Sequence, residues 1–343
     1  MKLKFENQAF QLQAIESTVN LFSGMHTITL SEQLSNQSEI LSYDIVANGL
    51  QLNNDLLLSN LQGIQLANSL GNYSTELCYG NYTEIPNFSI EMETGTGKTY
   101  VYLRTAFELN KRHGLTKFII VVPSDAIRAG VLKSLEITKE HFKSEYNNIS
   151  YDYYQYDSDK ISKVRDFATT NSIQIMVMTI SAFNKDINNI YAFKDKFGEY
   201  RPIDLVAAVK PVVIIDEPQS VDNTENAKEA IKKLNPLFIL RYSATHKNDY
   251  NQIYKLDAID AYNQKLVKQI EVASIEDADF IALDNKPYIK VIEINAKLEL
   301  SLELDVQDIK GKITRKILKK VTKGSDLQEK TNNEHYYGYI VED

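Results

Sequence analysis

The sequence predicts an α/β fold in which helices cover a parallel β-sheet, followed by a partial second unit with antiparallel β-strands. From residue 87 onward, short apolar runs alternate with helical patterns, as they do in parallel sheets that are covered by helices. Residues 287–306 instead alternate apolar and polar residues over long stretches, as half-buried antiparallel strands do. We therefore expect a first domain at 1–250. Residues 251–343 form the start of a second lobe or an inserted β-rich unit, apparently truncated.

Composition and charge restrict the possible classes of protein. With 343 residues, 43% apolar and 24% charged, the chain is long enough for two or three globular domains. The single cysteine, Cys78, excludes a disulfide framework. No signal peptide and no run of eighteen apolar residues is present, which predicts a cytoplasmic protein without membrane association. At a net charge of −8, a nucleic-acid partner requires a local basic groove.

The elements follow from periodicity, in chain order. Ile15, Val19 and Phe22 lie on one face of an expected N-terminal helix that packs on the sheet. Residues 31–86, rich in Asn, Ser, Gln and Leu, are interpreted as an insertion without clear chemistry. Strands are expected at Phe88–Met92, Lys117–Val122, Gln174–Thr179, Val212–Asp216 and Leu237–Tyr242, and helices at Lys98–His113 and Asp125–His141, the latter capped by Ser124.

Two further segments have two interpretations each. The tyrosines between Tyr146 and Tyr156 are able to stack on unpaired bases, but β-propensity favours a strand there. In Lys312–Lys323, Ile313, Ile317 and Val321 have helical spacing among cations. That segment is either the solvated face of a helix or a helix that follows a phosphate backbone.

The strongest motif is Glu93–Thr99, Glu-Thr-Gly-Thr-Gly-Lys-Thr, between an expected strand and an expected helix. Its glycines let successive backbone N–H groups point at phosphates, and the helix N-terminus adds its dipole. Lys98 adds a mobile positive charge and Thr99 a hydroxyl for Mg²⁺. The predicted cofactors are therefore ATP and Mg²⁺. The residues assigned to nucleotide binding are Gln13, Thr94, Gly95, Thr96, Gly97, Lys98 and Thr99. The Gln13 amide is suited to both edge atoms of adenine, but a solvated polar residue on an amphipathic helix is an alternative interpretation of Gln13.

A second motif ends the expected strand Val212–Asp216, where doubly wound sheets place catalytic groups. Asp216 is suited to hold Mg²⁺, and Glu217 to orient or deprotonate the attacking water. With Lys98, these are the predicted catalytic residues, and Thr99 and Asp216 are the predicted metal ligands. An acidic turn after a strand is common and does not by itself indicate a catalytic site. The evidence for a catalytic motif is its position along the chain after the phosphate-binding loop.

Polar residues at other strand ends complete the predicted site. Gln219, Ser243 and Thr245 are expected to couple hydrolysis to movement of a bound strand. Hydroxyls and helix N-termini that follow strands commonly contact phosphates. The predicted nucleic-acid contacts are accordingly Pro123, Ser124, Thr179 and Ser181.

The order of these motifs resembles that of a superfamily 2 helicase. The residue sequence within and around the motifs is similar to the N-terminal portion of the restriction (Res) subunit of type III restriction-modification enzymes. The similarity runs from Phe5 to about Val291. Its most specific stretches are Met92–Thr105, Lys117–Ser124, Arg128–Lys133, Asp216–Gln219, Leu240–His246 and Leu256–Asn263.

The resemblance implies a RecA-like P-loop NTPase fold and an ATP-driven motor on double-stranded DNA. It also implies a DNA methyltransferase (modification) subunit as partner, which brings S-adenosylmethionine, and ATP hydrolysis coupled to DNA cleavage. The family's arginine-rich motif of the second lobe does not follow Thr245, and the nuclease pattern has one loose candidate, Asp284-Asn285-Lys286, which we interpret as a loop. We expect a fragment or a truncated chain without the nuclease domain. The alternatives are a non-catalytic ATP- or partner-binding module and another helicase-type ATPase acting on DNA or RNA.

Overall fold

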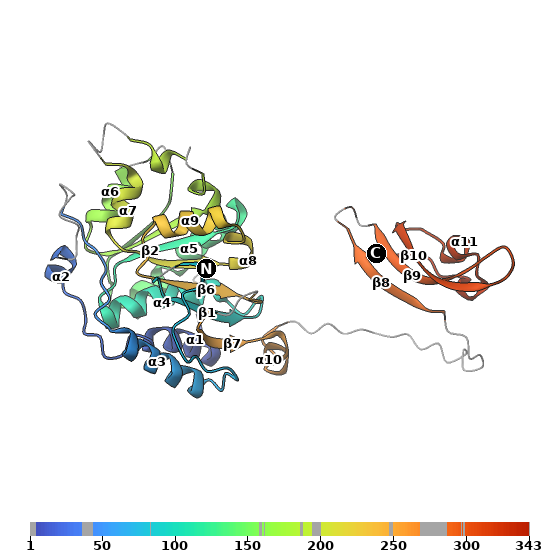
Figure 1. Cartoon of the computed structure of the whole chain (residues 1–343), viewed down its shortest axis with the longest axis horizontal. Helices are drawn as coiled ribbons and strands as arrows, with labels where there is room; N and C mark the ends of the chain where they lie inside the picture. The colour runs from blue at the N-terminus through green and yellow to red at the C-terminus, as the bar shows by residue number, and fades with distance from the viewer. Residues whose placement is uncertain are drawn as a thin grey trace. The chain divides into compact units, whose positions relative to one another are not determined.

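The chain forms two compact units, Met1–Gln269 and Ile270–Asp343 (Figure 1). The computed structural model describes residues 5–35, 44–82, 84–157, 160, 162–185, 188–193, 200–246, 250–267, 287–295, 297 and 299–342. The candidate triplet at 284–286 lies outside these residues. Among the described residues, no helix combines the length and the apolar character needed to cross a membrane.

The first unit is built on a seven-stranded parallel sheet in the order β3-β4-β2-β5-β6-β1-β7. All five expected strands are present, each within one residue of the predicted bounds. The tyrosine-rich segment is a strand as well, as β-propensity favoured. The strands are β1 Asn87–Met92, β2 Lys117–Val122, β3 Tyr151–Gln155, β4 Ile173–Thr179, β5 Val212–Asp216, β6 Phe238–Ser243 and β7 Gln252–Leu256. Because β7 joins this sheet, the first unit continues past residue 250.

Helices bury both faces of the sheet. Along β2, Phe118 and Ile120 belong to one apolar core, while Ile119 and Val121 belong to the other. The first core is covered by α1 Ala9–Asn20, α3 Asn54–Ala67, α4 Lys98–His113 and α5 Asp125–Glu145, and the second by α6 Ser162–Thr169, α7 Pro202–Ala208 and α9 Glu225–Lys233. This two-sided burial explains why the strands read as continuous apolar runs. The predicted cap of α5 is confirmed, because the Ser124 hydroxyl accepts from Ile127 N.

The expected insertion is tied into the first unit. The Asn48 amide donates to the Lys117 and Lys210 carbonyls at 2.9 and 3.2 Å and accepts from Thr116 N at 2.9 Å. It thereby joins the starts of β2 and β5. The Gln65 amide donates to Gln252 O at 2.9 Å and secures α3 to β7. Shorter helices follow at α2 Leu30–Ser35, α8 Pro218–Val221 and α10 Ala258–Asn263.

The second unit is a three-stranded antiparallel sheet in the order β10-β9-β8, followed by α11 Leu327–Thr331. The strands are β8 Ile289–Ile294, β9 Leu300–Gln307 and β10 Ile313–Val321. The prediction of antiparallel strands is confirmed. The expectation of a helix at 312–323 is wrong, because this segment forms β10. Its residues Leu318 and Val321 pair with Leu302 and Leu300 of β9 and pack on the same buried face. Spacing of three or four residues between apolar side chains also arises in a strand that contains a bulge, and β10 has its irregularity between Leu318 and Val321.

Candidate active site

The loop between β1 and α4 has the shape that the phosphate-binding motif predicts. The Thr96 hydroxyl and amide both donate to Glu93 O, at 2.6 and 3.2 Å, and curl the loop. Gly97 is the N-cap residue of α4 with a φ of 88°, and a Cβ there would lie 2.5 Å from the Gln11 amide nitrogen. The first N–H groups of α4 have no acceptor within the helix. The loop therefore offers N–H donors and a positive dipole end, which fit a phosphate group.

Lys98, the first residue of α4, connects this loop to the carboxylates after β5. Its ammonium lies 2.9 Å from Glu217 Oε1 and donates to Met92 O at 3.3 Å. The other Glu217 oxygen accepts from the Gln219 amide at 2.7 Å. Burial raises the pKa of Glu217, but the hydrogen bonds from Lys98 and Gln219 outweigh it and hold the pKa below its usual value. Glu217 also has a left-handed backbone with a φ of 56°, a strain that is concentrated at functional sites.

Asp216 lies deeper than Glu217, with 6% of its surface exposed. Burial, followed by repulsion from Glu217, raises the pKa of Asp216 to about 6. The Tyr102 hydroxyl donates to Asp216 Oδ2 at 3.3 Å. Thr99 lies three residues before Tyr102 on the same face of α4, which brings α4 close to Asp216 near Thr99. A hydroxyl and a carboxylate fit Mg²⁺, which takes its remaining ligands from phosphates and water. Tyr102 was missed in the sequence, where its position one helical turn after Lys98 is the available signal.

The residues assigned to coupling form one hydrogen-bonded group. Ser243 ends β6, and its hydroxyl lies 3.1 Å from Glu217 Oε2, 3.0 Å from Gln219 Oε1 and 2.7 Å from Thr245 O. Thr245 N donates back to the same hydroxyl at 3.1 Å. A serine hydroxyl has one proton, so these three acceptors compete for it. The arrangement allows a change at Glu217 to redistribute the hydrogen bonds of β6.

The two glutamines of α1 have different surroundings. Gln13 donates to Asn68 Oδ1 of α3 at 3.0 Å in an exposed position. Gln11 donates to Thr96 O at 2.9 Å and touches the phosphate-binding loop. Residues two apart on a helix point in different directions. The residue expected from the sequence is Gln13, whereas the side chain that lies at the loop is that of Gln11.

The residues assigned to nucleic-acid contact follow two neighbouring strands. Val122 of β2 pairs with Thr179 of β4, so Pro123 and Ser124 emerge beside Thr179 and Ser181. The Thr179 and Ser181 hydroxyls are 3.0 Å apart. All strands of this sheet run parallel, so their carboxyl ends lie on the same side of the sheet. These side chains therefore lie on the side that also carries Asp216 and the loop after β1.

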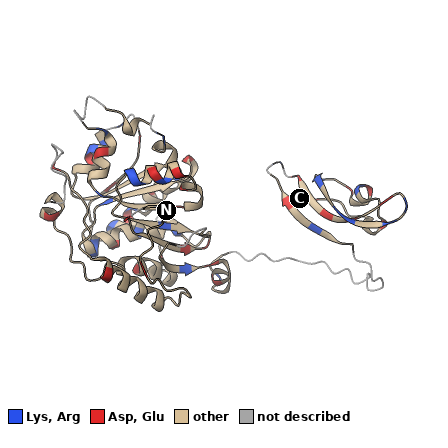
Figure 2. Cartoon of the chain, viewed as in Figure 1, with Lys and Arg blue, Asp and Glu red and all other residues tan. Residues whose placement is uncertain are grey.

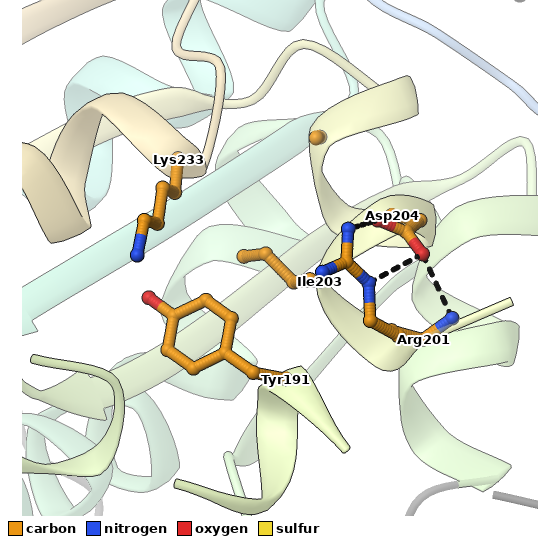
Figure 3. A pocket seen from close by; sticks show the side chains of 6 residues that line it. Tyr191, Arg201, Ile203, Asp204 and Lys233 are labelled. Atoms are coloured by element: carbon orange, nitrogen blue, oxygen red, sulfur yellow. Dashed lines mark hydrogen bonds and ion pairs between the residues drawn. The ribbon is translucent and has the colours of Figure 1, made fainter. Parts of the chain in front are cut away.

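A separate cavity of about 470 Å³ lies between α7 and α9 (Figure 3). Arg201 and Asp204 form an ion pair of 2.8 Å on its wall, and the Lys233 ammonium lies 4.8 Å from the centre of the Tyr191 ring. None of the residues assigned from the sequence lines it.

The chain is similar in sequence to proteins of one described family. Residues 4–248 match the family model described as "Type III restriction enzyme, res subunit". The chain is 33% identical over 241 residues to the EcoP15I Res subunit of Escherichia coli, covering 64% of this chain and 24% of that protein. It is 31% identical over 288 residues to the EcoPI Res subunit of Escherichia phage P1, covering 77% and 28%. Among solved structures, a Sulfolobus solfataricus SWI2/SNF2 ATPase core in complex with double-stranded DNA matches at a TM-score of 0.33 and 16% identity, covering 61% and 34%.

A parallel sheet with a phosphate-binding loop after β1 and paired carboxylates after β5 defines a RecA-like P-loop domain of the helicase-type ATPases. The chain belongs to the family of type III restriction enzyme Res subunits. It spans about a quarter of the length of the curated relatives it matches.

Proposed function

We propose that this chain binds and hydrolyses ATP with Mg²⁺ and serves as the DNA-translocating motor part of a type III restriction endonuclease subunit. The observation that carries the proposal is the contact between Lys98 of the phosphate-binding loop and Glu217 of the carboxylate motif, 2.9 Å apart. That contact supports the proposal because it joins the two motifs from which we infer an ATP hydrolysis site. Family membership supports the substrate class.

The chain's own residues divide the work at this site. The N–H groups at the start of α4 bind phosphate oxygens, and Lys98 leaves Glu217 to neutralise the terminal phosphate. Glu217 is then free to orient the attacking water and accept its proton, and loss of the Lys98 hydrogen bond raises the pKa of Glu217, which makes it a stronger base. Thr99 and Asp216 would hold Mg²⁺, which would supply positive charge next to the phosphates. Through Ser243 and Gln219, the change at Glu217 reaches β6.

The nucleic-acid side of the motor lies on the same sheet edge. Pro123, Ser124, Thr179 and Ser181 follow two neighbouring strands, and the hydroxyls and the start of α5 suit phosphate oxygens of the DNA backbone. Gln13 or Gln11 recognises the adenine edge, and the Gln11 contact with Thr96 favours Gln11.

ATP hydrolysis with and without duplex DNA tests the proposal, beside the variants Lys98→Ala and Glu217→Gln. We expect DNA-stimulated turnover in the unaltered chain. Lys98→Ala should lose ATP binding, and Glu217→Gln should bind ATP while its turnover falls at least about 100-fold. ATP binding without turnover in the unaltered chain would contradict the motor assignment and favour a non-catalytic module. Equal stimulation by RNA would favour a different helicase-type ATPase.

The partner is proposed from the family alone. We propose a DNA methyltransferase subunit that reads the recognition sequence and supplies the S-adenosylmethionine site, and with which this chain couples ATP hydrolysis to DNA cleavage. Co-purification of this chain with the modification subunit of the same system tests the association. The absence of a complex in the presence of Mg²⁺ and ATP would argue against it.

A further inference from the structure

The second unit carries a cationic segment in a chain of opposite overall charge. Residues 310–323 contain seven lysines and arginines and no carboxylate, whereas the whole chain has a net charge of −8. The seven are Lys310, Lys312, Arg315, Lys316, Lys319, Lys320 and Lys323. The chain therefore concentrates positive charge at one place in the second unit.

The fold displays this segment and leaves its charge largely uncompensated. Its central part, Ile313–Val321, forms β10, an edge strand that pairs with β9 alone. All seven cationic residues are exposed. Figure 2 colours the lysines and arginines of the chain blue. Arg315 pairs with Asp305 at 3.0 Å and lies 3.6 Å from the centre of the Tyr288 ring. Within the described part of the chain, no carboxylate lies within ion-pair distance of Lys312, Lys316, Lys319 or Lys320.

Lysines on an edge strand also prevent edge-to-edge aggregation. That role needs a few charges within the strand. Here the cations continue beyond both ends of β10, from Lys310 in the preceding turn to Lys323 after the strand. Lys316 is paired with Leu304 of β9, so the residue directly opposite Lys316 on the neighbouring strand is not acidic. The arrangement suits an extended polyanion more than it suits edge protection.

We propose that β10 and its two flanking turns bind the phosphate backbone of duplex DNA. At about 3.3 Å per residue, nine residues of β10 extend roughly 30 Å, which approaches one helical turn of DNA. The inference rests on the proposed function, because duplex DNA is the polyanion on which the motor acts. It adds a contact surface outside the sheet edge that carries Ser124 and Thr179.

The test measures duplex affinity of the full chain as a function of salt, for the triple variant Lys316→Gln, Lys319→Gln, Lys320→Gln. Each lost phosphate contact lowers the slope of log affinity against log salt by about 0.9. We expect the slope to fall by up to about 2.7, and affinity at about 0.1 M salt to fall roughly ten-fold or more. The matched control changes three exposed lysines of the first unit, Lys111→Gln, Lys133→Gln and Lys139→Gln, and should keep slope and affinity close to those of the unaltered chain.

Each result separates this inference from the proposed function. An unchanged slope in the β10 triple variant, or an equal decrease in both triple variants, overturns the role of β10 and leaves the motor site untouched. Failure of the unaltered chain to bind duplex at any salt overturns the DNA partner itself. Vesicles of phosphatidylserine and phosphatidylcholine form a further arm, in which β10-dependent binding to vesicles but not to duplex also overturns the inference. Circular dichroism of both variants verifies that their folds are intact.

Discussion

At Asp216, the stability of the fold and the proposed role in catalysis oppose each other. Its pKa rises from the ordinary 3.8 to about 6 on folding, first because of burial. Between these values the folded state binds more protons than the unfolded state, so stability falls as pH rises through that window. The raised pKa lowers the free energy of unfolding by a value on the order of 3 kcal/mol above pH 6. Asp216→Asn should therefore be more stable than the unaltered protein by up to about that amount at pH 7.5, and no more stable below about pH 4.

Urea unfolding at both pH values measures this difference. Asp260→Asn, an exposed change on α10, is the control and should leave the free energy of unfolding within about 0.5 kcal/mol. A stability gain of Asp216→Asn that is equal at pH 4 and pH 7.5 would show that ionisation of Asp216 is not its source. The same variant should lose the affinity for Mg²⁺ that the carboxylate provides.

The two glutamines of α1 allow a second test at the residue scale. Gln11 donates to the Thr96 carbonyl in the phosphate-binding loop, whereas Gln13 bonds to Asn68 of α3. Loss of one such hydrogen bond costs about 1 kcal/mol, or roughly a five-fold change in an equilibrium constant. We expect Gln11→Ala to weaken ATP binding by at least that factor and Gln13→Ala to leave it nearly unchanged, as measured by titration with a fluorescent ATP analogue. The reverse order of effects would support the assignment of Gln13 to adenine.

At the scale of elements, a buried ion pair joins β6 to the segment after α8. Arg241 and Asp222 are 2.7 Å apart, with 6% and 5% of their side chains exposed. The Tyr82 hydroxyl donates to Asp222 at 2.5 Å, and the Arg241 guanidinium lies 4.6 Å from the centre of the Tyr250 ring. Arg241→Ala leaves an unpaired buried charge and should lower the free energy of unfolding by about 3–5 kcal/mol.

The double variant Arg241→Met, Asp222→Leu removes both charges and should lose far less stability than Arg241→Ala, as measured by urea unfolding. Lys133→Ala breaks an exposed pair with Glu136 and provides the control, with an expected change under about 1 kcal/mol. If the double variant is as unstable as Arg241→Ala, the lost stability comes from packing around the pair and not from its charge.

Elements with a strong pattern of apolar residues were predicted correctly from the sequence, and elements with a weak apolar pattern were not. Buried strands such as β2 and β5 are continuous apolar runs, and their bounds agree with the sequence to the residue. β7 and β10 are edge strands that mix apolar with polar or charged residues without a regular period, so pairing with the neighbouring strand decides their structure. The phosphate-binding loop and the carboxylates could be assigned because chemistry restricts their residue types. Tyr102 and Gln11 could not, because a contact through space has no fixed spacing along the chain.

At the scale of the whole molecule, the two units have separate cores and should respond separately to mutation. The core of the second unit is small: Leu302, Leu304, Val321, Leu327 and Tyr336. Tyr336 is fully buried, and its hydroxyl donates to Tyr288 O at 2.5 Å and accepts from Asp305 N at 2.9 Å. Tyr336→Ala removes a large aromatic side chain and both hydrogen bonds, and the expected cost is about 3–5 kcal/mol.

In a core of that size, such a loss should unfold the second unit while the first remains folded. Hydrogen exchange measured by mass spectrometry reports on the folding of each unit separately. We expect amides of β9 and β10 to lose protection in Tyr336→Ala, while those of β2 and β5 keep it and ATP binding is unchanged. Phe142→Ala, in the core of the first unit, should give the opposite pattern, since Phe142 is buried against Phe107 with ring centres 4.6 Å apart. Loss of protection across both units in either variant would mean that they fold as one cooperative body, and effects of mutations in β10 on DNA affinity would then have to be separated from effects on the motor domain.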